Sequence, residues 1–151
     1  MFINYVFFED KLIYFLPLFF LQIFLEQSNE EREHMIKIFT YVMEQDSEPV
    51  IPSLNVIGDE EISFDVVSMF ESSLMSEKNI TNAINKIMSK CKDVEDYTTE
   101  NFLQWFIVEQ REEENKFKEI LDNLKIIGDN KLGLYELNKS LNPYIDPPKP
   151  V

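Results

Sequence analysis

With 28 Asp and Glu residues against 14 Lys and Arg, the 151-residue chain carries a formal charge of −14, which repels nucleic acid and anionic membranes and attracts cations. Its three glycines form neither GxGxxG nor GxxxxGK[ST], which argues against nucleotide-binding loops. The single cysteine, Cys91, rules out an internal disulfide and is consistent with a reducing cytoplasm, and no Cys/His cluster indicates structural zinc.

The N-terminal part of the chain contains a long apolar run, LIYFLPLFFLQIFL, at residues 12–25. A membrane-spanning helix needs about 18 or more apolar residues, and this run is shorter. A secretory signal needs basic residues before the run and a small-residue cleavage site, whereas here Lys11 follows the acidic pair Glu9 and Asp10. We interpret the run as the start of a buried helix, with a membrane segment or a signal as the alternatives.

Apolar residues recur at steps of three and four in three long segments, which predicts an all-α protein. The hydrophobic content of 44% is enough to close the core of one domain. The helices are predicted at about residues 17–45, 60–92 and 98–127, with Pro17 opening the first and Gly128 ending the third. Their inner stripes are Phe20, Phe24, Gln27, Glu31, His34, Ile38 and Val42; Phe70, Leu74, Glu77, Ile80, Ile84, Ile87 and Cys91; and Phe102, Phe106, Glu109, Glu113, Phe117, Ile120 and Leu124.

The connecting segments indicate how these helices follow one another. DVEDYTT is short enough to force the second and third helices into an antiparallel hairpin. Residues 46–59 contain two prolines and a glycine and are long enough to cross a bundle from end to end, as in helical bundles with one long crossover. Residues 132–141 are predicted to form a short extra helix before a polar tail at residues 143–151.

Each inner stripe is apolar at both ends and carries a carboxylate near its middle, at Glu31, Glu77 and Glu113. Burying ionised carboxylates is costly unless cations or metals accompany them, and three carboxylates with one imidazole cannot neutralise one another. A pair of divalent or trivalent metal ions would satisfy them. Carboxylate-rich ligation with one nitrogen suits iron or manganese better than zinc or copper.

The spacing of the polar residues supports the same interpretation. Glu31 and His34 form Glu-x-x-His, which points both side chains the same way from one helix, and Gln110 and Glu113 repeat this spacing. Four-helix di-iron proteins use such pairs together with single glutamates. Most other charged residues in EEREH and EQREEE are expected to face water, Arg111 and Lys116 among them, and Cys91 is expected in the core. Three of these acids could bind metal instead of facing water: Glu30, Glu109 and Glu112.

Three segments together resemble the second, third and fourth helices of the bacterial non-haem ferritins: EQSNEEREHMIKIFTYV, SSLMSEKNITNAIN and NFLQWFIVEQREEENKFKEILDNLKIIGDN. The resemblance covers about residues 26–142, and FLQWF, EQxxEE and a closing GDN occur in the order typical of the family. It implies a ferritin-like four-helix bundle with one long crossover and a short C-terminal helix.

The resemblance also implies a ferroxidase centre with two iron ions. In that centre Glu31 bridges both irons, His34 binds the first, Glu77 and Glu113 bind the second, and Gln110 lies beside the first iron or the oxygen site. The residues implied to surround a third iron are Glu30, Glu109, Glu112 and Glu113.

Ferritins oxidise Fe(II) with dioxygen and store the ferric mineral in a hollow shell of twenty-four subunits. The resemblance therefore implies an iron-storage protein, a ferroxidase that acts in the cytoplasm as a homo-oligomer. Its partners would be Fe(II), Fe(III) and dioxygen, with no nucleic acid and no membrane. The rubrerythrins, another non-haem iron family, are disfavoured because they carry a CxxC module and a second Glu-x-x-His, neither of which occurs in this sequence.

The beginning of the chain departs from the family pattern. A ferritin has a complete first helix that supplies a glutamate to the first iron, whereas the residues before Lys11 would make only about 15 Å of helix. We expect the first helix to be truncated or replaced. We divide the chain into a divergent segment at residues 1–25, a ferritin-like bundle domain at 26–142 and the tail. The alternative functions are an inactive or truncated subunit that only co-assembles with intact ferritin, and a membrane-tethered helical protein.

Overall fold

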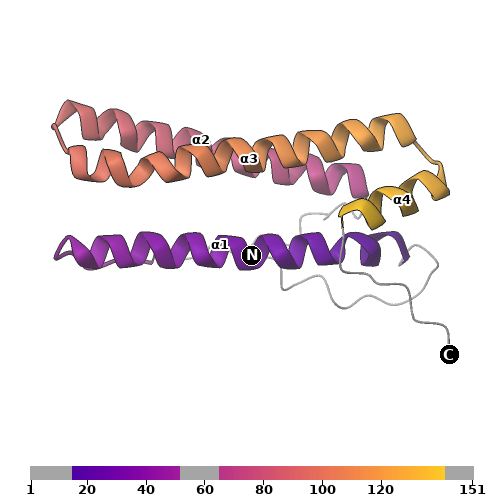
Figure 1. Cartoon of the computed structure of the whole chain (residues 1–151), viewed down its shortest axis with the longest axis horizontal. Coiled ribbons are helices and arrows are strands. Elements are labelled where there is room, and N and C mark those ends of the chain that lie inside the picture. The colour runs from indigo at the N-terminus through magenta and orange to yellow at the C-terminus, as the bar shows by residue number, and fades with distance from the viewer. Residues whose placement is uncertain (1–14, 52–64, 142–151) are drawn as a thin grey trace. The chain divides into compact units, whose positions relative to one another are not determined.

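The computed structural model describes residues 15–51 and 65–141, and all regular structure in these ranges is helical (Figure 1). The chain divides into two compact units. One unit spans residues 1–62 and 135–151 and contains α1 (Phe15–Glu44) and most of α4 (Lys131–Leu141). The other unit spans residues 63–134 and contains α2 (Val66–Asp93), α3 (Tyr97–Ile127) and the first turn of α4. The prediction of an all-α protein is confirmed.

Helix α1 has no glycine and carries its single proline in the first turn, where a missing N–H breaks no helical hydrogen bond. Phe20, Ile23 and Phe24 are buried, in keeping with the prediction that the apolar run opens a buried helix. The helix ends at Glu44, and Asp46 adopts the left-handed region with φ 54°, as residues after a helix end often do. No helix within the described ranges is both long and apolar enough to cross a membrane.

Helices α2 and α3 form an antiparallel pair joined by only three residues, which confirms the predicted hairpin (Figure 1). The carboxylate of Asp65 caps α2 by accepting hydrogen bonds from the backbone N–H and the hydroxyl of Ser68, both at 2.9 Å. The cap places the start of α2 at Val66 and not near Glu60 as predicted. The contact between the helices is apolar at both ends: Phe70 packs on Phe117 with ring centroids 6.2 Å apart, and a second cluster comprises Ile84, Cys91, Leu103 and Phe106.

Asp96 occupies both the turn between the helices and the N-cap of α3, where it accepts from the backbone N–H of Thr99 at 3.0 Å and from its hydroxyl at 2.6 Å. These hydrogen bonds, that of the hydroxyl first, lower the pKa of Asp96 below its ordinary value. A carboxyl group with a lowered folded-state pKa stabilises the protein above its unfolded pKa and loses this effect as the pH falls through the folded value.

We therefore expect Asp96→Asn, which keeps a capping oxygen but not the charge, to lower the thermal unfolding midpoint at pH 7. The difference from the parent should shrink as the pH falls below about 4, the usual pKa of an aspartate. Thermal melts of the two proteins across this pH range check the expectation. A difference that does not change with pH would show that the charge of Asp96 contributes nothing.

The end of α3 requires glycine twice. Gly128 follows Ile127 with φ 55° and donates its N–H to the carbonyl of Leu124 at 2.9 Å, so the predicted role of this glycine in ending the helix is confirmed. A Cβ atom on Gly133 would lie 2.7 Å from Cγ2 of Ile127, closer than a side chain can approach. The predicted short helix is present as α4, where the side chain of Asn130 accepts from the backbone of Leu132 and Gly133.

Several predictions concern residues that the structure does not describe. The first helix, expected to be truncated or replaced, would fall within residues 1–14, most of the crossover within 52–64, and the polar tail within 142–151, all outside the described ranges. The domain boundaries at residues 25 and 142 stay predictions. Helix α1 runs through residue 25 without a break.

Candidate metal centre

The predicted metal ligands lie in two groups, one in each unit. We call Glu31 and His34 of α1 the α1 half-site, and Glu77 of α2 with Gln110 and Glu113 of α3 the α2–α3 half-site. Within the described ranges no three His, Cys, Asp or Glu side chains are gathered closely enough to hold a metal ion.

In the α1 half-site, the helical step of three residues brings the two side chains together as the sequence predicts. Nδ1 of His34 lies 3.8 Å from Oε1 of Glu31. The prediction that both lie on a buried face holds better for the imidazole than for the carboxylate, because the side chain of His34 is 13% exposed and that of Glu31 is 41% exposed. One turn earlier on the same stripe, Gln27 is buried.

In the α2–α3 half-site, all three predicted ligands are buried. Their exposed fractions are 5% for Glu77, 3% for Gln110 and 6% for Glu113. The amide Nε2 of Gln110 donates to Oε2 of Glu77 at 3.0 Å and to its backbone carbonyl at 3.2 Å, so this hydrogen bond joins the two helices. The predicted stripes therefore correctly placed Glu77 and Glu113 on buried faces, whereas Gln110 is buried and its neighbour Glu109, which stood on the stripe, is only partly buried.

Lys116 departs from its predicted role as a purely solvated residue. Its side chain is partly buried, and its Nζ lies 3.7 Å from Oε2 of Glu113, one helical step away. Arg111 is exposed, as predicted. The lysine supplies positive charge beside a buried carboxylate, which lowers the cost of burying it.

Besides the buried Glu113, the three acids implied to surround a third iron differ in exposure. Glu109 is partly buried, whereas Glu30 and Glu112 are exposed. Cys91 is buried in the apolar cluster of α2 and α3, and burial raises the pKa of its thiol, with the carboxylates of Asp96 and Glu100 adding to the effect. Cys91 is thus a core residue without an activated thiolate, as expected.

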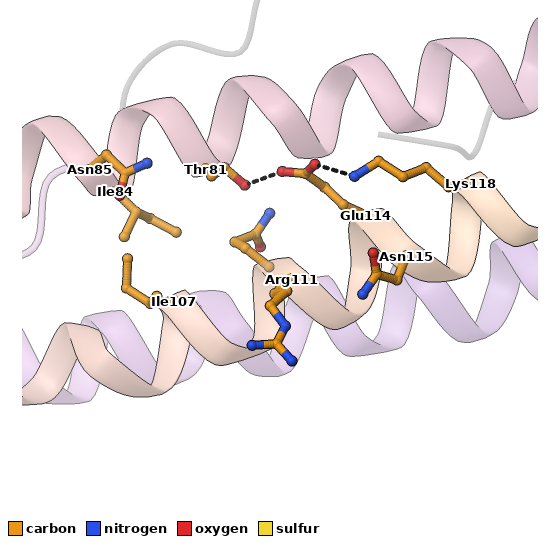
Figure 2. A pocket seen from close by; sticks show the side chains of 9 residues that line it. Thr81, Ile84, Asn85, Ile107, Arg111, Glu114, Asn115 and Lys118 are labelled. Carbon is orange, nitrogen blue, oxygen red and sulfur yellow. Dashed lines mark hydrogen bonds and ion pairs between the residues drawn. The ribbon is translucent and has the colours of Figure 1, made fainter.

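One polar group beside the α2–α3 half-site was not singled out by sequence reasoning. The carboxylate of Glu114 accepts from the hydroxyl of Thr81 at 2.9 Å through Oε1 and from Nζ of Lys118 at 2.9 Å through Oε2. Figure 2 shows this carboxylate between its two donors. The hydrogen bonds from Lys118 and Thr81, in that order, lower the pKa of Glu114, so it is ionised at neutral pH. The one signal in the sequence was the favourable i, i+4 spacing of Glu114 and Lys118.

A cavity of about 250 Å³ lies between α2 and α3 along this group. Gln110 forms part of its wall, so the cavity adjoins the α2–α3 half-site. The remaining lining residues are Thr81, Ile84, Asn85, Ile107, Arg111, Glu114, Asn115 and Lys118 (Figure 2).

Residues 20–127 match the family model described as a ferritin-like domain. This range includes all five residues of the two half-sites. The chain belongs to the ferritin family. The relatives agree with this assignment: a probable bacterial non-heme ferritin-like protein of Haemophilus influenzae is 40% identical over 112 residues, which cover 74% of this chain and 67% of that protein. A bacterial non-heme ferritin of Campylobacter jejuni is 38% identical over 109 residues, which cover 72% of this chain and 64% of the relative.

Solved structures show the same ferritin fold. An open-pore ferritin from the hyperthermophilic archaeon Archaeoglobus fulgidus superposes with a TM-score of 0.73 at 29% identity, covering 83% of this chain and 81% of the archaeal chain. The predicted resemblance to bacterial ferritins and the ferritin-like fold are thereby confirmed. The chain spans about two thirds of the length of the two bacterial relatives that it matches.

Proposed function

We propose that this ferritin stores iron, oxidises Fe(II) with dioxygen at a di-iron centre and holds the ferric product inside a multi-subunit shell. The observation that carries the proposal is the burial of Glu77, Gln110 and Glu113 together on one helix pair. Buried carboxylates are normally accompanied by positive charge, and Lys116, 3.7 Å from Glu113, supplies one such charge. Iron is a hard cation well matched to carboxylate and amide oxygens and would supply positive charge to Glu77 as well.

The proposed roles follow the chemistry of each side chain. Glu31 has two carboxylate oxygens and would bridge both irons, and His34 would bind the first through an imidazole nitrogen. Glu77 and Glu113 would bind the second iron, with Gln110 beside the first iron or the oxygen site. The acids proposed to surround a third iron are Glu30, Glu109, Glu112 and Glu113.

In this proposal the protein's part in the reaction is to fix the ligands and keep coordination positions open. Each Fe(II) would give up one electron, so a pair of irons held close together would reduce one dioxygen by two electrons to hydrogen peroxide, with two protons taken from water. The net charge of −14 favours the approach of Fe(II) to the protein. We propose the cytoplasm as the compartment, because the single Cys91 is a free thiol.

The experiment that tests the proposal is aerobic incubation of the purified protein with Fe(II), followed by the ferric absorbance, with a protein-free sample and an oxygen-free sample as controls. We expect oxidation well above the protein-free rate and a particle mass by light scattering that corresponds to many subunits. Oxidation no faster than in the protein-free sample would contradict the enzyme. A large particle without oxidation would instead indicate a subunit with only a structural role.

A further inference from the structure

Two pairs of side chains, one helical turn apart on each helix, are hydrogen-bonded across the middle of α2 and α3. Gln110 donates to Glu77, and Thr81 donates to Glu114. Glu77 and Thr81 are four residues apart on α2, and Gln110 and Glu114 are four residues apart on α3. Each pair therefore lies on one face of its helix.

The order of these pairs is crossed. In an antiparallel helix pair, a residue later in one helix faces a residue earlier in the other. Contacts between directly facing residues would therefore join Glu77 to Glu114 and Thr81 to Gln110. The observed hydrogen bonds join Glu77 to Gln110 and Thr81 to Glu114. We call this arrangement the crossed brace.

A crossed brace resists sliding of the helices in both directions. Movement of α3 along its axis in one direction lengthens the hydrogen bond of Gln110, and movement in the opposite direction lengthens that of Glu114. One residue corresponds to about 1.5 Å along a helix axis, whereas hydrogen bonds are confined to about 2.5–3.2 Å between heavy atoms. A slip of one residue would therefore strain one contact or the other, depending on its direction.

The carboxylate of Glu114 is well suited to this task because both of its oxygens are held. Lys118 engages Oε2 at 2.9 Å from the next turn of the same helix, which leaves Oε1 directed at Thr81. Hydrogen bonds to a charged acceptor in a partly buried setting are roughly twice as strong as neutral ones. The contact is therefore a firmer restraint than a neutral hydroxyl–amide pair.

We propose that Thr81 and Glu114 are positioning residues for the iron site, because the crossed brace sets the register of α2 on α3 and thereby holds Glu77 against Gln110. This inference rests on the proposed function. Neither Thr81 nor Glu114 is among the proposed ligands, and their effect passes through Gln110 and Glu77.

The test compares Thr81→Val, which keeps the shape but removes the hydroxyl, with Thr81→Ser, which restores the hydroxyl. Thr40→Val is the matched control, because Thr40 is an exposed threonine within α1. We expect Thr81→Val to lower kcat for Fe(II) oxidation by about tenfold, the lower end of the effect of removing groups that orient metal ligands. The assay runs well below the unfolding midpoint, Thr81→Ser should recover most of the rate, and Thr40→Val should match the parent.

A second readout needs no iron. Amide hydrogen exchange should accelerate in Thr81→Val around residues 77–81 and 110–114, and not at the α3–α4 turn. Thr81→Ala removes the same hydroxyl and introduces a better helix former. This variant replaces Thr81→Val in both measurements if the valine variant folds poorly.

The two readouts separate the brace from the proposed function. A parent protein that oxidises iron together with an unaffected Thr81→Val rate would overturn the brace alone. If the parent itself does not oxidise iron, the proposed function fails, and amide hydrogen exchange alone tests the crossed brace. Unchanged exchange in Thr81→Val would then overturn the crossed brace. Faster exchange confined to residues 77–81 and 110–114 would support it.

Discussion

Replacing Glu113 with alanine is expected to slow Fe(II) oxidation by about 100-fold or more, because groups that merely orient a metal ligand already contribute about 10–100-fold. Glu113 is buried on α3 and is a ligand of the second iron in the proposed centre. Glu31→Ala is expected to have an effect of the same size, because in the proposed centre this carboxylate would serve both irons. The initial rate of ferric absorbance in air measures both variants.

Two exposed glutamates on the same helices provide matched controls. Glu119→Ala on α3 and Glu33→Ala on α1 remove the same charge from solvated positions and should oxidise iron at the parental rate. Parental rates in both Glu113→Ala and Glu31→Ala would refute the assignment of the ligands. A slow Glu113→Ala variant with an unchanged unfolding midpoint would show that the loss comes from the site and not from the fold.

Phe117→Ala is expected to destabilise the protein by about 3–5 kcal/mol, the usual cost of removing a phenyl ring from a packed core. The side chain of Phe117 is fully buried, and its ring packs on Phe70 across the α2–α3 pair. The loss includes the transfer of the ring from the core to water and the cavity that remains. Urea denaturation followed by the helical circular dichroism signal measures the change.

Ile126→Ala is the control for that experiment, because Ile126 lies on the same helix but is 83% exposed. Substitutions at such positions usually change stability by less than about 0.5 kcal/mol. A loss in Phe117→Ala no larger than that in Ile126→Ala would contradict the view that this aromatic contact holds the helix pair together.

The helices themselves were predictable from local signals. The apolar residues recur with the helical period, and Gly128 marks the end of α3 in the sequence as it does in the structure. The start of α2 was predicted too early because charged and apolar residues alternate ambiguously before Asp65. In the structure Ser68 donates two hydrogen bonds to the carboxylate of Asp65, which caps the helix and marks its start.

The exposure of individual stripe positions was less predictable. Ile38, Ile80 and Ile87 were expected on inner stripes, yet all three are exposed. A stripe read at steps of three and four spans a wide arc of the helix, and residues at its edge are covered only if a neighbour packs there. Periodicity locates the centre of a buried face, and the arrangement of the neighbouring helices decides its width.

For the candidate site, the stripes placed Glu77 and Glu113 on buried faces, and both are buried. Gln110, which was singled out by its spacing from Glu113, is buried as well, whereas Glu109 on the stripe is only partly buried. The crossed brace escaped prediction because Thr81 and Glu114 look like solvated helix residues. Their contact depends on how far one helix is shifted along the other, a quantity that residue spacing within a single helix does not contain.

The three-residue connection between α2 and α3 also bears on how the protein folds. Closing a short loop costs little chain entropy, and contacts between residues close in sequence form early in folding. The α2–α3 hairpin can therefore assemble at a small entropic cost. We expect the apolar cluster near its turn and the Phe70–Phe117 contact at its open end to form the nucleus between whose ends the buried polar residues take up their positions.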